Sequence, residues 1–252
     1  MATAAERSQS FGAIAEDYDR LRPGPPDEAV DWLLPAGCQV AVDLGAGTGL
    51  LTRMLARNVP RVVAVEPDGR MRAVLHDRSP GIEALDGRGE AIPLPDASAD
   101  GVFVSSAWHW MDPERTVAQV TRVLRDGGRF GLIWTRRDSE TGWLHEISLR
   151  ERAGRARTGR RRGPRSVALP AGADLAGIRT RSFSFMLTMT VDALVAMLGT
   201  YSGVITASPA ERAAGLDRAR AALDALFPGA GELDVPMRAG CWRADRVPRA
   251  GA

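Results

Sequence analysis

Three glycines follow an acidic residue in the first fifth of the chain. Residues 40 to 50 read Val-Ala-Val-Asp-Leu-Gly-Ala-Gly-Thr-Gly-Leu, so Asp43 precedes Gly45, Ala46, Gly47 and Gly49. An apolar run that leads through such a turn into a helical pattern predicts a strand and a helix start, where backbone N–H groups are open to a ligand. Glycine allows positive φ and a close approach to the backbone. The segment therefore predicts a cofactor-binding loop.

The spacing of these glycines distinguishes between two kinds of cofactor loop. The dinucleotide-binding pattern G-x-G-x-x-G/A needs a small residue at its sixth position, so that helix and strand can pack closely. Counted from Gly45, that position is Leu50. The spacing therefore disfavours a dinucleotide-binding enzyme.

A second short β-branched run, residues 62 to 65, ends in Glu66 and Pro67. The carboxyl edge of a parallel sheet faces the ligand crevice, and a carboxylate there can accept bonds from both ribose hydroxyls. Dinucleotide enzymes use the same device. Glu66 thus predicts a nucleoside ligand but does not distinguish a dinucleotide from another nucleoside cofactor. The alternative interpretation is that Glu66 is a solvated acid at a strand end.

Composition excludes several classes of enzyme. All 33 basic residues of the Lys+Arg count are arginine. P-loop proteins, Schiff-base aldolases, pyridoxal phosphate enzymes and protein kinases all need a lysine amine, and none of them fits. Abundant alanine and arginine are typical of a GC-rich bacterial genome.

Length, charge and cysteine usage indicate an ordinary globular protein. A chain of 252 residues that is 44% hydrophobic can bury a full core, and its net charge of +2 does not indicate nucleic-acid binding. Cys38 and Cys241 have no metal-ligand spacing, so no metal site is predicted and reduced thiols are expected. Residues 1 to 10 lack the pattern of a signal peptide, and no apolar run has the length of a membrane span. We expect a cytoplasmic protein.

Strand and helix patterns alternate along the chain and predict an α/β fold with a doubly wound sheet. Strands are predicted at 40–43, 61–65, 81–84, 101–105, 129–134, 181–187 and 235–242. Helices are predicted at 9–21, 27–34, 49–58, 69–76, from Asp112-Pro113 to about 124, and as two segments after 187, the second over 208–226. The caps at Asp112 and Ser208, each followed by proline, set two of these helix starts.

The regular alternation stops after Trp134. Residues 150 to 165 hold eight arginines and few apolar side chains. Such a run is usually a solvated loop, which is the favoured interpretation here. The alternative is a lid whose guanidinium groups attract an anionic substrate, since arginine pairs with carboxylates in bidentate fashion.

Several motifs resemble class I S-adenosylmethionine (SAM) dependent methyltransferases. Asp43-x-Gly45-x-Gly47-x-Gly49 resembles their first motif, and residues 11 to 23, Phe-Gly-Ala-Ile-Ala-Glu-Asp-Tyr-Asp-Arg-Leu-Arg-Pro, resemble the N-terminal segment of the ubiquinone/menaquinone biosynthesis type (methyltransferase type 11). Residues 89–94 and 123–128 are similar to that group's Ala-Glu-x-Leu-Pro-Phe loop and Leu-Lys-Pro-Gly-Gly turn. The His-Trp of residues 108–112 is similar to trans-aconitate methyltransferases. Arg88 departs from the pattern, because an acid often stands there to bond the adenine amino group.

The resemblance implies one domain over residues 1–252 with a seven-stranded Rossmann-like sheet, an antiparallel last strand and an insertion after the fifth strand. Its parts would be an N-terminal helical cap (1–36), a SAM-binding core (37–135), an arginine-rich insertion or lid (136–178) and C-terminal strands with substrate-side helices (179–246). The implied cofactor-binding residues are Tyr18, Arg22, Asp43, Gly45, Ala46, Gly47, Gly49, Glu66, Pro67, Met71, Gly89, Glu90, Ser105 and Trp108.

Methyl transfer from SAM mainly needs in-line placement of a nucleophile, with a base where the nucleophile carries a proton. His109 is the candidate base, because an imidazole titrates near neutral pH. The equal alternative is a histidine that orders the 108–112 turn. His145 and Tyr201 are candidate substrate-binding residues.

The sequence thus predicts methyl transfer to a small molecule, with oxygen as the expected accepting atom by analogy. A carboxylate or a secondary metabolite is the expected acceptor. Two alternatives stay open: a SAM-binding protein that acts as a cyclase or a binding subunit, and an RNA methyltransferase that binds through residues 150–165.

Overall fold

The computed structural model describes residues 12–138, 140, 142–144, 147 and 167–248. The chain divides into two compact units. Unit 1 comprises Met1–Pro23, Arg136–Arg160 and Ser184–Arg238, and unit 2 comprises Gly24–Thr135, Arg161–Phe183 and Ala239–Ala252. The predicted substrate residue His145 and the arginine-rich segment 150–165 lie outside the described residues.

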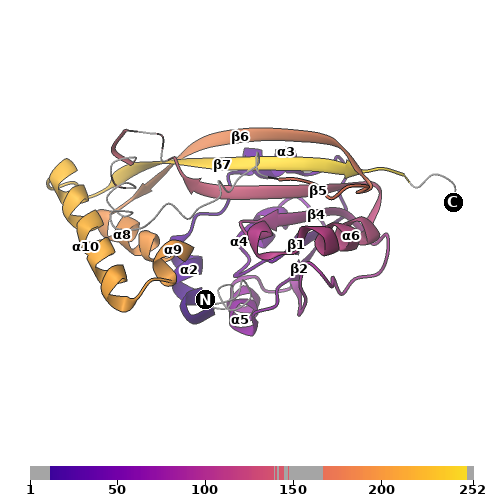
Figure 1. Cartoon of the computed structure of the whole chain (residues 1–252), viewed down its shortest axis with the longest axis horizontal. Helices are drawn as coiled ribbons and strands as arrows, with labels where there is room; N and C mark the ends of the chain where they lie inside the picture. The colour runs from indigo at the N-terminus through magenta and orange to yellow at the C-terminus, as the bar shows by residue number, and fades with distance from the viewer. Residues whose placement is uncertain (1–11, 139, 141, 145–146, 148–166, 249–252) are drawn as a thin grey trace. The chain divides into compact units, whose positions relative to one another are not determined.

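Seven strands form one sheet in the order β3-β2-β1-β4-β5-β7-β6 (Figure 1). The strands are β1 (Val40–Leu44), β2 (Arg61–Val65), β3 (Glu83–Leu85), β4 (Ala99–Ser105), β5 (Leu124–Arg137), β6 (Leu175–Met189) and β7 (Leu233–Arg246). The pairs β1–β2, β1–β4, β2–β3 and β4–β5 are parallel, whereas the last strand is antiparallel. This arrangement confirms the predicted fold class.

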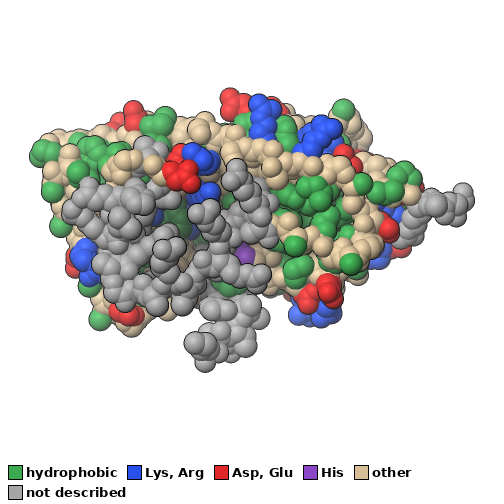
Figure 2. All heavy atoms as spheres, turned by 45° about the horizontal axis from the view of Figure 1, so that its top comes forward, with side chains coloured by type: hydrophobic (Ala, Val, Ile, Leu, Met, Phe, Trp, Pro, Cys, Tyr) green, Lys and Arg blue, Asp and Glu red, His purple; other side chains and the backbone are tan. Residues whose placement is uncertain are grey.

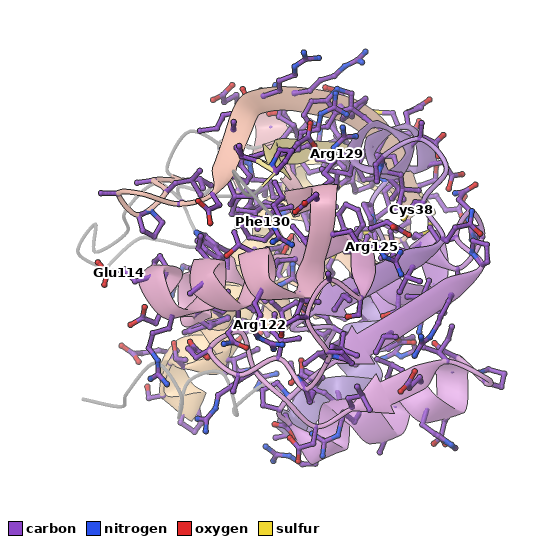
Figure 3. All side chains as sticks on the ribbon, turned by 90° about the vertical axis from the view of Figure 1, so that its right-hand side faces the viewer. Cys38, Glu114, Arg122, Arg125, Arg129 and Phe130 are labelled. Carbon is purple, nitrogen blue, oxygen red and sulfur yellow. The ribbon has the colours of Figure 1, made fainter. Side chains whose placement is uncertain are left out.

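Unit 2 surrounds the parallel strands with α3 (Asp27–Leu33), α4 (Leu50–Leu55), α5 (Gly69–Arg78), the short 3₁₀ helix η2 (Trp108–Trp110) and α6 (Pro113–Val123). Helix α6 begins as predicted, since Asp112 accepts a hydrogen bond from the N–H of Arg115 and proline follows it. Figure 3 shows α6 with Glu114 near its start and Arg122 toward its end. Arg122 donates to the carbonyl oxygens of Ile92 and Leu94 and so fixes the preceding loop.

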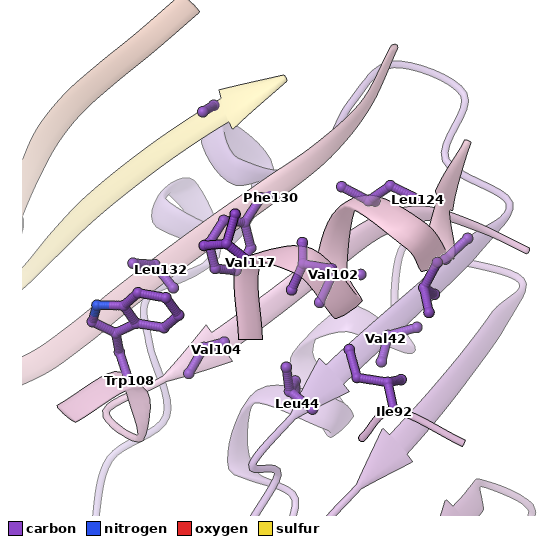
Figure 4. Packing of buried hydrophobic residues seen from close by; sticks show 14 of the residues in the cluster. Val42, Leu44, Ile92, Val102, Val104, Trp108, Val117, Leu124, Phe130 and Leu132 are labelled. Carbon is purple, nitrogen blue, oxygen red and sulfur yellow. The ribbon is translucent and has the colours of Figure 1, made fainter. Parts of the chain in front are cut away.

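The core of unit 2 lies on the central strands. In β1, four of five residues are buried, which is typical of a parallel strand covered on both faces. Val42, Val102, Leu132 and Phe130 belong to one apolar cluster with the inner face of α6 (Figure 4). Their burial removes large apolar areas from water and holds the ends of β1 and β4 in register.

Unit 1 has its own core. It contains η1 (Gly12–Ile14), α2 (Ala15–Leu21), α8 (Val191–Gly199), α9 (Ser202–Ile205) and α10 (Pro209–Leu226). The capping box at Ser208 and Glu211 is present as predicted. Leu194, Met197 and Leu223 are buried together in this core, with Leu21 packed against them.

Several predicted boundaries were wrong. Strand β6 begins at Leu175 rather than 181, because most of its side chains are exposed and give no apolar alternation to read. Strand β5 begins at Leu124, directly after α6, although residues 125–128 include two glycines that normally indicate a turn. After β6 the described chain forms three helices rather than two, since the four-residue α9 is too short to carry a periodic pattern.

Candidate cofactor site

The predicted cofactor loop joins β1 to α4 in unit 2. The N–H groups of Gly45 and Ala46 both donate to the carbonyl oxygen of Val65, at 2.8 and 3.2 Å, so the loop is fastened to the end of β2. Gly45, Gly47 and Gly49 have φ of 70°, 58° and 88°. At Gly47, apart from its chain neighbours, no heavy atom of the described residues lies within 4 Å of the position that a Cβ would take. This glycine therefore combines a left-handed backbone with open space beside it.

Glu66 connects this loop to the end of β2. Glu66 is 8% exposed, and its Oε2 accepts a hydrogen bond from the N–H of Gly47 at 2.8 Å. Its Oε1 accepts from the N–H of Asp68 at 2.9 Å. Burial raises the pKa of Glu66, although these two hydrogen bonds act in the opposite direction and lower it. Each carboxylate oxygen has capacity for a further bond, so the side chain can still accept from a ligand.

Asp43, at the end of β1, is fully buried. The hydroxyl of Thr52 donates to its Oδ2 at 2.6 Å, whereas its Oδ1 is buried without a hydrogen-bond partner among the described residues. Burial raises the pKa of Asp43 to about 7. A buried acceptor without a partner is costly, and it fits a site that a ligand donor completes.

A hollow of about 320 Å³ lies beside the end of β2. It is lined by Pro67, Asp86, Gly87, Arg88 and Ala91. The carboxylate of Asp86 forms an ion pair with Arg72 at 3.1 Å. Sequence reasoning named Pro67 here but missed Asp86 and Gly87, although an acid that directly follows the third strand was a readable signal. Arg88 stands where related proteins often have an acid, but Asp86 places a carboxylate in the same hollow.

Gly89 and Glu90 hold the turn at this hollow against α6. A Cβ on Gly89 would lie 2.7 Å from the Oγ1 of Thr116 and 2.9 Å from the Sδ of Met111, so only glycine fits without movement. The Oε1 of Glu90 accepts a hydrogen bond from the N–H of Asp112 at 2.8 Å. Both residues therefore have structural roles, whatever they contribute to a ligand.

The end of β4 places the other predicted residues. Ser105 ends the strand, and Ser106 follows it with φ of 55°, an uncommon conformation for a residue other than glycine. Trp108 is 8% exposed and packs edge-on against Phe130, with ring centroids 5.6 Å apart (Figure 4). The ring of His109 lies 4.4 Å from that of Trp110. Met71, in α5, is buried.

Three predicted residues belong to unit 1 instead. Arg22 follows α2, its guanidinium carbon lies 5.3 Å from the ring of Tyr18, and it stacks on Tyr201 at 3.7 Å. The structure thus brings Tyr18, Arg22 and Tyr201 together. Thr200 and Arg137 belong to the same group, and sequence reasoning missed both because nothing local indicates a contact over so many residues.

The described residues offer no cluster of three or more histidines, cysteines or acids that could hold a metal ion. Cys38 and Cys241 are buried free thiols, and burial raises their pKa to about 11 and about 12. Figure 3 shows Cys38 on the side of unit 2 that carries Arg125. Thiols with such values are poor nucleophiles at neutral pH. No helix in the described ranges is long and apolar enough to cross a membrane.

Several surface charges of the described residues lie in pairs of opposite sign. Figure 2 shows the described arginine and acidic side chains of one face in small neighbouring groups. In unit 2, Arg61 pairs with Glu83 at 3.0 Å and Arg129 with Asp245 at 2.7 Å. Among the described residues this distribution gives no support to a nucleic-acid surface.

Comparisons with known proteins agree with this geometry. The methyltransferase domain family matches residues 42–132. An uncharacterised methyltransferase of Mycobacterium bovis is 50% identical over 142 residues, which are 56% of this chain and 58% of that protein, so the chain matches less than two thirds of this relative. An uncharacterised methyltransferase-like protein of Schizosaccharomyces pombe is 30% identical over 204 residues, 77% of this chain and 78% of that protein.

Two further proteins add to the comparison. A malonyl-[acyl-carrier protein] O-methyltransferase of Hahella chejuensis is 36% identical over 131 residues, 48% of this chain and 47% of that protein. A solved structure from Anaeromyxobacter dehalogenans, described as a type II methyltransferase, has a TM-score of 0.69 at 26% identity and covers 90% of this chain and 99% of its own. The glycine loop, Glu66 and Asp43 all lie inside the matched segment of the domain family.

Proposed function

The chain belongs to the class I, SAM-dependent methyltransferase family, and on that premise we propose that it transfers the methyl group of SAM to a small-molecule acceptor. The observation that carries the proposal is the β1–α4 loop. There the open space at Gly47 adjoins the Glu66 carboxylate that the loop itself fixes.

SAM would supply a methyl group that its sulfonium already activates for attack. The residues of unit 2 then have to bind and orient. Glu66 would accept bonds from the ribose hydroxyls, and the unpartnered Oδ1 of Asp43 would accept from a charged donor such as an ammonium group. The adenine ring would enter the hollow lined by Pro67 and Asp86, where the Asp86 carboxylate would accept a bond from its amino group.

We propose oxygen as the accepting atom and a carboxylate as the acceptor group. Support comes from the Hahella chejuensis relative, whose name specifies O-methylation. A carboxylate is already deprotonated at neutral pH, so its oxygen can attack without a base. On this proposal His109 orders the 108–112 turn and binds no proton of the acceptor.

Calorimetric titration tests the cofactor assignment. We expect SAM and S-adenosylhomocysteine to bind and NADH not to bind. The Gly47→Val variant should lose this binding, because a branched side chain would fill the open space and strain a backbone with φ of 58°.

Gly37→Val is the matched control. Gly37 also has a positive φ, of 70°, and apart from its chain neighbours no described residue has a heavy atom within 4 Å of its Cβ position. It lies before β1, whereas the loop follows β1. Both variants bear the same kind of backbone strain. Equal loss of binding in the two variants, or binding of NADH, would contradict the assignment.

A further inference from the structure

One acid and one base line the hollow beside the end of β2. They are Asp86 and Arg88, two residues apart in the segment that follows β3, and both are exposed. The glycines that alternate with them, Gly87 and Gly89, face occupied space instead. A Cβ on these two glycines would lie only 2.6 and 2.7 Å from the nearest side-chain atom. The segment therefore packs against unit 2 at its glycines and carries a carboxylate and a guanidinium at the hollow.

Asp86 is held in place by Arg72 of α5. The Nη2 of Arg72 donates to the Oδ2 of Asp86 at 3.1 Å, and its Nη1 donates to the carbonyl oxygen of Glu66 at 2.6 Å. One guanidinium thus fixes the acid of the hollow relative to the end of β2. A carboxylate can accept several hydrogen bonds, so Asp86 can accept a further one from a ligand.

Arg88 brings donors to the same hollow. Its backbone N–H donates to the carbonyl of Ala91 at 3.5 Å and its carbonyl accepts from the N–H of Ala91 at 3.0 Å, which closes the 88–91 turn. In the part of the chain that the structure describes, its guanidinium has no hydrogen-bond or ion-pair partner. Since an acid often stands at this position in similar methyltransferases, the chain carries donors at a place where they carry an acceptor.

The edge of adenine that is farthest from its ribose has the complementary pattern. There the exocyclic amino group donates and the neighbouring ring nitrogen N1 accepts. With the ribose at Glu66, this edge would enter the hollow first. Hypoxanthine has the opposite pattern at the same edge, because it presents a carbonyl oxygen and an N1–H group.

We infer that Arg88 donates a hydrogen bond to N1 of the adenine while Asp86 accepts from the amino group, an inference that rests on the proposed function. Arg88 is then a specificity-determining residue of the cofactor site, and Arg72 is the residue that positions Asp86. A backbone N–H of the 88–91 turn is the other possible donor to N1. The test therefore has to separate the side chain from the backbone.

The first part of the test changes the ligand and leaves the protein intact. Calorimetry measures the affinities of S-adenosylhomocysteine and of its 1-deaza and 7-deaza analogues, in which one ring nitrogen becomes C–H. The 1-deaza analogue should bind about tenfold more weakly, as expected for loss of a charge-assisted bond, and the 7-deaza analogue should bind unchanged. S-inosylhomocysteine, which carries hypoxanthine, should bind about a hundredfold more weakly because both bonds are lost.

The second part combines these ligands with a variant. Arg88→Met keeps a long side chain and removes the guanidinium. It should weaken the binding of S-adenosylhomocysteine about tenfold and should not weaken that of the 1-deaza analogue, because the two changes remove the same bond. Arg115→Met is the matched control. It removes the same charge from an exposed side chain of α6 that does not line the hollow, and it should leave every affinity unchanged.

Three results would overturn the inference. They are equal binding of S-adenosylhomocysteine and its 1-deaza analogue by the wild type, equal weakening of both ligands in Arg88→Met, and equal effects of Arg88→Met and Arg115→Met. The second result would assign N1 to a backbone N–H. In each case S-adenosylhomocysteine still binds, so the proposed function stands, whereas no binding by the wild type would overturn both.

Discussion

Replacing Asp43 with asparagine should change how the stability of the ligand-free protein depends on pH. Asp43 is fully buried, and burial raises its pKa from 3.8 to about 7. Between these two values the folded protein holds a proton that the unfolded chain releases. The free energy of unfolding should therefore fall as the pH rises through this window and level off above pH 7.

The pKa values set the size of this effect. Each tenfold change in proton affinity contributes about 1.4 kcal/mol, so the rise to about 7 corresponds to about 4 kcal/mol between pH 4 and pH 8. The amide of the introduced asparagine carries no charge at any of these pH values. The Asp43→Asn variant should lack this part of the slope, and the stability difference between variant and wild type should shift in favour of the variant by up to this amount.

Urea denaturation followed by tryptophan fluorescence measures the free energy at pH 4.5, 5.5, 6.5 and 7.5 for both proteins. Subtracting the two curves removes most of the contribution of other titrating groups, including Glu66, whose charge also raises the pKa of Asp43. Asp31→Asn, at an exposed carboxylate of α3, is the control and should run parallel to wild type. If the Asp43→Asn curve also runs parallel to wild type, the buried carboxylate is not protonated as argued.

Two further variants test packing and positioning. Gly89→Ala should lower the free energy of unfolding by about 1–3 kcal/mol, because the new Cβ would lie 2.7 Å from the Oγ1 of Thr116. Unchanged stability in urea denaturation would contradict this, since it would mean that α6 shifts without loss of free energy. Thr200→Val should cost about 1–3 kcal/mol, because the Nε of Arg22 and the carbonyl of Met197 both lose a bond, whereas Thr200→Ser should retain most of the stability. A Thr200→Ser variant as unstable as Thr200→Val would contradict this reasoning, because serine retains the hydroxyl that makes both hydrogen bonds.

Local patterns predicted the strand, the glycine turn and the helix start of the candidate cofactor loop. Asp43, Gly47 and Glu66 follow short apolar strands, and the strand ends of a parallel sheet meet at one edge. Such signals need only neighbouring residues. The hydrogen bond from Gly47 to Glu66, over 19 positions, follows directly from the pairing of β1 with β2.

Contacts between segments that are distant along the chain could not be predicted from the sequence. The bond from Arg22 to Thr200 spans 178 positions, and neither residue is part of a pattern that indicates the other. The same reason explains why Arg137 was missed, since an arginine at the end of a strand has no special signal. Trp108 was predicted beside the cofactor, yet its packing on Phe130 could be read only from the assembled core.

Glu66 fixes the Gly47 loop and is also the proposed ribose ligand, and a simple mutation does not separate these two roles. Its oxygens each accept one backbone N–H, from Gly47 and from Asp68, and the same oxygens are the proposed acceptors of the ribose hydroxyls. A glutamine at this position would turn one acceptor into an NH₂ donor facing a backbone N–H, which leaves both donors without a partner. Loss of cofactor binding in such a variant would therefore reflect a disordered Gly47 loop as much as a lost ribose contact. The loop and the residue proposed to bind the ribose thus form one unit, because the carboxylate that would bind the ligand also fixes the backbone that leaves room for it.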